Sequence, residues 1–178
     1  MKSLQIGLGV AALALVGIAP AHASELYGAV RAGQTSNTSV EGIDLNDGFA
    51  YGGAIGGAVG PVRVEVAADH LSGDFAGVVD ASAWDYSASA ILDLPISHDA
   101  AVFGGVGVDY VSAEAHVPFG SMDASGKGWS YQAGVSHRFA NGVMGEVRYK
   151  HTTASLDVGG GSADLDTDLV SAGLRFTL

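Results

Sequence analysis

The segment LVSAGLRFTL at residues 169–178 alternates between apolar and polar side chains. One parity carries Val170, Ala172, Leu174, Phe176 and Leu178, and the other carries Ser171, Gly173, Arg175 and Thr177. Because successive side chains of a strand point to opposite faces, this pattern predicts a β-strand with one apolar and one polar face. The same period of two recurs through the chain upstream of this segment.

Eight such segments follow residue 24: Glu25–Ala32, Gly48–Val59, Val62–Leu71, Ala81–Leu92, Ala100–Val111, Lys127–Phe139, Val143–Thr152 and Asp168–Leu178. Three connections are short, at Gly60-Pro61, at Asp93–Asp99 and at Asn141-Gly142. The other four are longer and rich in Ser, Thr, Gly and Asp: Gly33–Asp47, Ser72–Asp80, Ser112–Gly126 and Thr153–Thr167. An even number of strands with all long connections at one end predicts an all-β, eight-stranded antiparallel up-and-down transmembrane β-barrel with four long extracellular loops.

Alternation does not by itself say which face lies inside, because a soluble barrel of the lipocalin kind buries its apolar face around a ligand. Two features favour the membrane. The polar face carries small and charged residues, which suit the narrow interior of eight strands. Six aromatic residues lie near the ends of the predicted strands on the apolar face, where interfacial belts occur: Trp84, Tyr86, Tyr110, Trp129, Tyr131 and Tyr149. We therefore expect the apolar face to contact lipid.

The first residues predict export. Lys2 precedes an apolar run from Leu4 to Ala19, and Ala21-His22-Ala23 fits the small-x-small pattern of a signal-peptidase site. The run is short for a transmembrane helix, which needs roughly 20 residues. We expect a cleaved signal peptide at residues 1–23 and one barrel domain at residues 24–178.

Composition excludes several classes of function. The chain has no cysteine, which excludes cysteine nucleophiles, thiolate metal sites and iron–sulfur clusters. Eight Lys and Arg against 19 Asp and Glu give a net charge of −11 at pH 7. The phosphates of a nucleic acid would be repelled by such a surface, so we expect no nucleic-acid partner. We also expect no cofactor and no bound metal.

Four stretches resemble known proteins: ELYGAVRAG at 25–33, VRVEV at 62–66, FGGVGVDY at 103–110 and SAGLRFTL at 171–178. They are similar to the OmpA-like and opacity-protein-like outer-membrane barrels, a broad superfamily of porin-family proteins. The resemblance covers the whole exported chain and implies the bacterial outer membrane, contact with its lipid and lipopolysaccharide, and insertion by the barrel-assembly machinery. We expect a monomer, although the sequence leaves the oligomeric state open. The family's carboxyl-terminal assembly signal is matched by Gly173, Leu174, Phe176 and Leu178, except that leucine stands where members usually end in an aromatic residue. We expect this difference to affect insertion and not the fold.

Charged residues on the polar face would share one confined lumen: Arg63, Glu65, Asp85, Glu146, Arg148, Lys150 and Arg175. Unpaired charges are costly there, so we expect hydrogen-bonded ion pairs across the lumen. This predicts a lumen closed by ion pairs, with a narrow path for ions or small solutes as the alternative. A second acidic group, Asp157, Asp164, Asp166 and Asp168, offers oxygen ligands for a divalent cation, but a solvated loop explains it as well.

One motif is enzyme-like. Lipid A deacylases of the eight-stranded type carry a His-x-Ser pair and a glutamate that orients the histidine, and His151-Thr152-Thr153 resembles that pair with Thr153 as the hydroxyl. A nucleophile, a base and an orienting acid are all required, and the sequence offers no clear acid. We therefore predict a non-enzymatic barrel of the cell envelope with a structural and surface-interaction role. A narrow porin is the main alternative and a lipid A-modifying enzyme the minor one.

Overall fold

The computed structural model describes residues 25–40, 43–44, 47–75, 79–117, 120–158 and 161–178. The predicted signal peptide lies outside these residues. No helix in the described ranges is long and apolar enough to cross a membrane.

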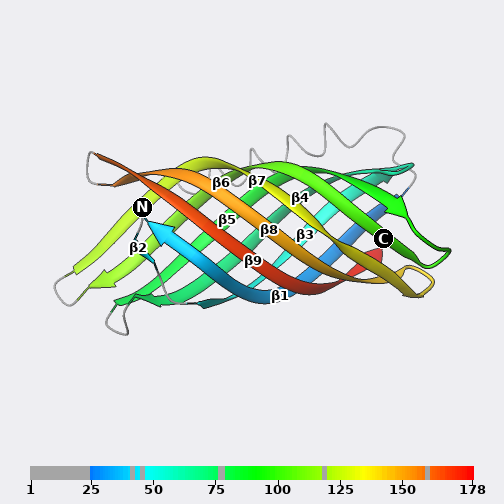
Figure 1. Ribbon diagram of the computed structural model, residues 1–178, viewed down its shortest axis with the longest axis horizontal. Helices are drawn as coiled ribbons and strands as arrows, with labels where there is room; N and C mark the ends of the chain where they lie inside the picture. Colours follow the sequence, from blue (N-terminus) through cyan, green and yellow to red (C-terminus); the bar gives the residue numbers. More distant parts are fainter. Residues whose placement is uncertain (1–24, 41–42, 45–46, 76–78, 118–119, 159–160) are drawn as a thin grey trace.

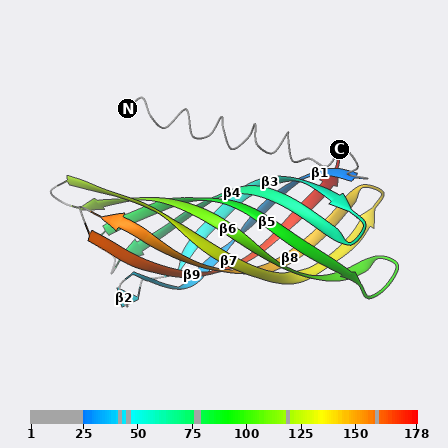
Figure 2. The ribbon, with the colours of Figure 1, turned by 90° about the horizontal axis from the view of Figure 1, so that it is seen from above.

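Antiparallel strands form almost all of the described chain (Figure 1). They are β1 (Glu25–Val40), β2 (Ile43–Asp44), β3 (Gly48–Val59), β4 (Val62–Phe75), β5 (Val79–Pro95), β6 (Ala100–Val117), β7 (Gly120–Ala140), β8 (Val143–Val158) and β9 (Gly161–Thr177). Each long strand pairs with the next, and β1 pairs with β9, so eight strands close a cylinder (Figure 2). The two residues of β2 pair only with the tip of β1. The predicted eight-stranded antiparallel up-and-down barrel is confirmed.

Tight turns lie at one end of the barrel, together with the start of β1 and the end of β9. Gly60 and Gly142 occupy two of these turns with φ values of 58° and 75°, which glycine adopts without a steric penalty. In the third turn, the hydroxyl of Ser97 accepts a hydrogen bond from the Ala100 amide at 3.1 Å. Short turns of outer-membrane barrels are periplasmic, which orients this one in the membrane.

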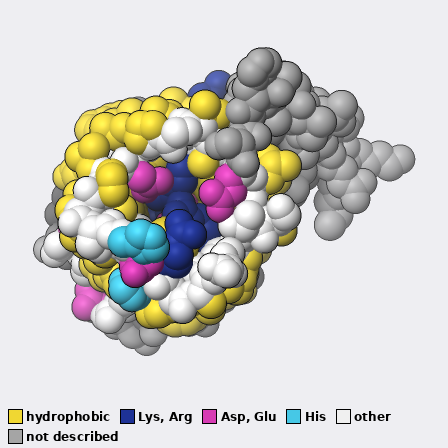
Figure 3. All heavy atoms as spheres, turned by 90° about the vertical axis from the view of Figure 1, so that its right-hand side faces the viewer, with side chains coloured by type: hydrophobic (Ala, Val, Ile, Leu, Met, Phe, Trp, Pro, Cys, Tyr) yellow, Lys and Arg dark blue, Asp and Glu magenta, His cyan; other side chains and the backbone are white. Residues whose placement is uncertain are grey.

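The two faces of the wall separate as the alternation predicts. Outward side chains include Ile55, Val106 and Val108, each more than 60% exposed to its surroundings. Inward side chains include Arg63 and Glu65, at 1% and 2%. Seen from the periplasmic end, Lys and Arg side chains fill the centre and a ring of hydrophobic side chains surrounds them (Figure 3).

The prediction of four long loops was wrong over most of their length. The strands continue far into those segments, so that β1 runs to Val40, β4 to Phe75, β6 to Val117 and β8 to Val158. The predicted turn at Asp93 also begins too early, because β5 continues to Pro95. The six aromatic residues of the belt consequently lie well inside their strands and not near the strand ends.

Along the longer strands, the inward and outward faces exchange their polarity. In the membrane part of β8, Val147 faces outward at 52% exposure and Lys150 faces inward at 4%. Beyond the aromatic residues, Leu156 faces inward at 4%, while Asp157 is exposed. The inward residues there form an apolar cluster: Val111, Ala154, Leu156 and Leu165, with Ala83 and Ala124 packed against it. Beyond the aromatic residues the barrel thus has an apolar interior and a polar exterior, as a soluble barrel has. We call these ends of the strands, on the side away from the tight turns, the extension.

Candidate functional site: the ion-paired lumen

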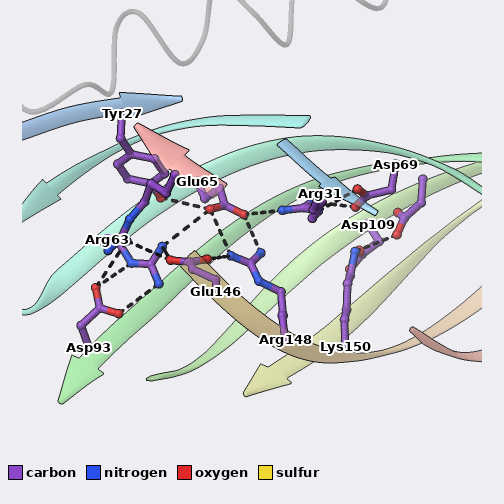
Figure 4. A network of polar contacts seen from close by, with 12 residues as sticks. Tyr27, Arg31, Arg63, Glu65, Asp69, Asp93, Asp109, Glu146, Arg148 and Lys150 are labelled. Carbon is purple, nitrogen blue, oxygen red and sulfur yellow. Dashed lines mark hydrogen bonds and ion pairs between the residues drawn. The ribbon is translucent and has the colours of Figure 1, made fainter. Parts of the chain in front are cut away.

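Glu65 on β4 is the hub of the lumen. Its carboxylate accepts hydrogen bonds from Arg31 at 3.0 Å and from Arg148 at 2.7 Å. The hydroxyl of Tyr27 donates to the same carboxylate at 3.1 Å. Figure 4 shows these groups converging from β1, β4 and β8. Ion pairs that join opposite walls in this way fill the interior of a narrow barrel.

Arg63 forms a second junction, nearer the periplasmic end. Its Nε lies 2.6 Å from Asp93 Oδ2, and its Nη1 lies 3.3 Å from Glu146 Oε1. Arg148 and Arg175 also contact Glu146, at 3.0 and 3.3 Å. Glu146 therefore contacts three arginines, and each charged side chain of this junction has an oppositely charged partner.

Arg31 and Asp69 form a two-bond fork. Arg31 Nε donates to Oδ1 at 2.8 Å and Nη2 donates to Oδ2 at 2.7 Å. Parallel bonds of this kind are stronger and more directional than a single contact. The fork holds Arg31 across the lumen from Asp69, and both side chains are buried.

Lys150 occupies the next level toward the extension. Its ammonium lies 2.7 Å from Asp85 Oδ2 and 2.7 Å from Asp109 Oδ1. All three side chains are less than one-tenth exposed. This cluster is separate from the arginine junctions, because Lys150 has no other ion pair among the described residues.

Aromatic rings pack between the arginines. The guanidinium of Arg63 lies 5.2 Å from the ring centre of Phe103 and that of Arg175 lies 5.1 Å from Tyr27. Such cation–π contacts stabilise desolvated guanidinium groups. Gly134 leaves room for Phe103, since a Cβ there would lie 2.5 Å from the ring.

Little free space is left in this interior. A cavity of about 10 Å³ beside Arg31, Glu146 and Arg148 has room for a single water. Beyond the Lys150 cluster, the inward side chains of the apolar cluster pack together inside the extension. Inward side chains thus occupy the described lumen at two successive levels, one ionic and one apolar.

The seven charges predicted for the lumen all point inward in the structure. Sequence reasoning left out four more members of the same networks: Arg31, Asp69, Asp93 and Asp109. Asp69 and Asp109 could have been predicted, because each alternates with the apolar residues of its strand and so belongs to the polar face. Asp93 was assigned to a turn, and Arg31 lies in a strand whose faces were not separated.

The belt and the assembly signal lie on the outer wall. Trp84, Tyr110, Trp129 and Tyr131 are 40 to 53% exposed. Ring contacts within the belt join Trp84 to Tyr86 and Trp129 to Tyr131, with ring centres 6.1 Å apart in both pairs. In the terminal segment Leu174 and Phe176 face outward, and the amide of Leu178 donates to the Leu26 carbonyl at 2.9 Å. Gly173 packs closely against β1, where a Cβ would lie 2.5 Å from the Val30 carbonyl.

The enzyme-like motif has an acidic partner that the sequence did not reveal. His151 Nδ1 lies 2.7 Å from Asp168 Oδ1, on the outer wall. The hydroxyl of Thr153 donates to Asp166 at 2.7 Å and lies 3.3 Å from His151 Nε2. A base activates a hydroxyl by accepting its proton, and this proton is directed to Asp166. The arrangement is that of a hydrogen-bonded surface network.

The predicted acidic loop lies in the extension. Asp164, Asp166 and Asp168 follow one another on the outward face of β9, and Asp168 also accepts hydrogen bonds from Tyr149 at 2.7 Å and Asn37 at 3.0 Å. Within the described residues these carboxylates do not converge with others into a group that suits a metal ion.

Solved structures with this fold include three barrels of bacterial outer membranes. Neisserial surface protein A has a TM-score of 0.76 and 18% identity, over 86% of this chain and 97% of that one. The attachment invasion locus protein of Yersinia pestis has a TM-score of 0.52 and 18% identity, over 85% and 99%. The N-terminal barrel of Pseudomonas aeruginosa OprF has a TM-score of 0.57 and 14% identity, over 86% and 98%. At these identities the likeness concerns the fold.

No curated protein sequence matches this chain. The model of the outer membrane protein beta-barrel domain matches residues 8–176, nearly the whole chain. This match agrees with the closed topology of the barrel and with its apolar outer wall. The chain belongs to the outer membrane protein β-barrel family, and its place is the bacterial outer membrane.

Proposed function

We propose that this protein is a non-enzymatic structural and surface-interacting barrel, and that its lumen is closed to solutes. The observation that carries the proposal is the succession of two barriers: the ion pairs around Glu65 and the apolar cluster around Leu156. An eight-stranded interior is just wide enough for side chains to fill. A protein with a closed lumen interacts with its partners through its outer wall.

Two zones of that wall suit different partners. The aromatic belt suits outer-membrane lipid and lipopolysaccharide, because amphipathic rings favour the headgroup level. The extension presents Ser155, Asp157 and Asp164 outward on paired strands. A hydrogen-bonded wall of this kind offers partners outside the membrane a fixed acidic surface. We propose that the protein acts as a monomer and is inserted by the barrel-assembly machinery.

Planar-bilayer recording tests the closed lumen. We expect the refolded barrel to insert without stable single-channel steps. Reproducible steps of one size would contradict the proposal and favour the alternative, a narrow porin for ions or small solutes.

Complementation of a strain that lacks the protein tests the role of the wall. We expect wild type and the lumen variant Asp85→Asn to restore resistance of the envelope to detergent equally. A variant with Asn at positions 157, 164 and 166 should insert normally but restore less resistance. Equal restoration by the surface variant, or failure of the lumen variant alone, would count against a function of the outer wall.

A further inference from the structure

The charges of the lumen balance at one level and not at the next. Among the described residues of the arginine junctions, four arginines meet four carboxylates: Arg31, Arg63, Arg148 and Arg175 with Glu65, Asp69, Asp93 and Glu146. At the next level, the single ammonium of Lys150 meets Asp85 and Asp109. That cluster carries one more negative charge than positive charge.

Neighbouring cations do not compensate for this excess. Arg31 on β1 is held in the fork with Asp69, which lies opposite Asp85 in the β4–β5 ladder. Arg148 on β8 is bound to Glu65 and Glu146. The inward side chains that β7 and β9 place at this level are uncharged: Ser130 and Gln132 on β7, and Thr167, Leu169 and Ser171 on β9.

Two carboxylate oxygens of the cluster have no partner. Asp85 Oδ1 and Asp109 Oδ2 are buried and receive no hydrogen bond, and the Asp109 side chain is fully buried. An uncompensated carboxylate in such a place is destabilising, as is the charge that remains when one member of a buried ion pair is removed. The site therefore favours a further positive charge.

Residues with hydroxyl groups lie on the strands next to Asp109. Asp109 lies opposite Ser87 in the β5–β6 ladder, and Gly107 next to it lacks a side chain. A Cβ at Gly107 would lie 2.6 Å from the Ser89 hydroxyl and 3.0 Å from the Ser130 hydroxyl, so β5 and β7 bring two hydroxyl groups together over this glycine. Hard cations prefer carboxylate and hydroxyl oxygens.

We propose that Asp85 and Asp109 form a buried binding site for one monovalent cation, either a proton or an alkali-metal ion, beside the ammonium of Lys150. The site holds its cation between the ionic and the apolar barrier. It does not depend on the function proposed above, since a closed and a conducting lumen would both contain it.

Carboxyl ¹³C signals and urea unfolding of the refolded, membrane-inserted protein test the site. Both are measured at pH 7 in sodium, potassium or N-methylglucamine chloride of equal ionic strength. For an alkali ion, we expect lower stability in N-methylglucamine, which is too large to enter. For a proton, we expect equal stability in all three salts and a neutral carboxyl signal from Asp85 or Asp109.

Matched variants separate the site from general salt effects. Asp85→Asn and Asp109→Asn each remove the excess charge, so both should abolish the cation dependence or the neutral carboxyl signal, and the variant that folds better serves if one folds poorly. Asp157→Asn, an exposed carboxylate outside the lumen, should leave either property unchanged. Two fully ionised carboxylates together with equal stability in all three salts would overturn the proposal.

Discussion

At the scale of single residues, Glu65 has the most partners in the lumen, and the first prediction concerns its removal. Glu65→Ala removes one of the two carboxylate partners of Arg31, which keeps Asp69, and of Arg148, which keeps Glu146, and it leaves the arginine junctions with one uncompensated positive charge. Removing one member of a buried ion pair costs about 3–5 kcal/mol, because the remaining charge stays desolvated. We expect a loss of that order in the free energy of unfolding, measured by urea titration in lipid vesicles with tryptophan fluorescence.

Asp157→Asn is the matched control for Glu65→Ala. It removes an exposed carboxylate on the outer wall of the extension. Surface substitutions of this kind usually change stability by less than about 0.5 kcal/mol. Equal losses for the two variants would mean that the lumen network does not stabilise the barrel.

Close packing at Gly134 gives a second prediction at this scale. A Cβ at Gly134 would lie 2.5 Å from the ring of Phe103 and 2.2 Å from the Val147 carbonyl, so Gly134→Ala overpacks the lumen. We expect a loss of about 1–3 kcal/mol in the same unfolding experiment. Gly104→Ala is the control, because its Cβ would point outward and meet its nearest neighbour, the Gln132 carbonyl, only at 3.9 Å. A Gly134→Ala variant as stable as Gly104→Ala would contradict the packing described here.

At the scale of elements, the upper parts of β8 and β9 are paired strands where loops were predicted. Thr153 pairs with Asp166 and Leu156 with Ala163 in a continuous ladder. Hydrogen-bonded amides exchange slowly with solvent. We expect the amides of this ladder to be protected in hydrogen–deuterium exchange. Exchange as fast as that of an unstructured peptide would restore the loop interpretation.

The apolar cluster should hold these strand ends together. Leu156→Ser removes buried apolar surface from it, so exchange should accelerate in the ladder above Thr152 and stay unchanged around Glu146. Ser155→Ala, on the exposed face of the same strand, should leave exchange unaltered. Uniform acceleration along β8 would indicate that the extension and the membrane part open as one unit.

Sequence reasoning recovered the number, order and faces of the strands, because period two survives wherever one face meets lipid. It missed the upper ends for a physical reason. Apolar residues change parity between Val147 and Leu156, and the Ser, Thr, Gly and Asp around them are typical of loops. The inverted alternation was present in the sequence, at Ala154 and Leu156 against Ser155 and Asp157.

The lumen was predictable as a set of residues and not as a set of pairs. Parity assigns Glu65 and Arg148 to the interior, but their contact joins strands 83 residues apart in the chain. Which side chains reach the same height depends on the tilt and stagger of the strands, which alternation does not encode. The contact of His151 with Asp168 was missed for another reason: the two residues are partners in the β8–β9 ladder, and its register was hidden because the segment between them was predicted as a loop.

At the scale of the whole molecule, inward side chains occupy the lumen at two levels in series, and a closed lumen as proposed predicts that each level acts as a barrier of its own. The paired variant Glu65→Ala/Arg148→Ala removes the central ion pair of the ionic level together with the charges of both its members. The paired variant Leu156→Ser/Leu165→Ser makes the apolar level polar. We expect neither variant alone to conduct in planar bilayers, since each leaves the other barrier in place.

Only the combination of all four substitutions weakens both levels, and it should give small single-channel steps. Folding of every variant is verified by its altered mobility on unheated gels, so that silence of a single-barrier variant cannot result from an unfolded barrel. Steps from the ionic variant alone would mean that water already passes the apolar cluster. Steps from the apolar variant alone would mean that ions already pass the pairs around Glu65. Only the apolar cluster would then act as a barrier, although side chains occupy the lumen at both levels.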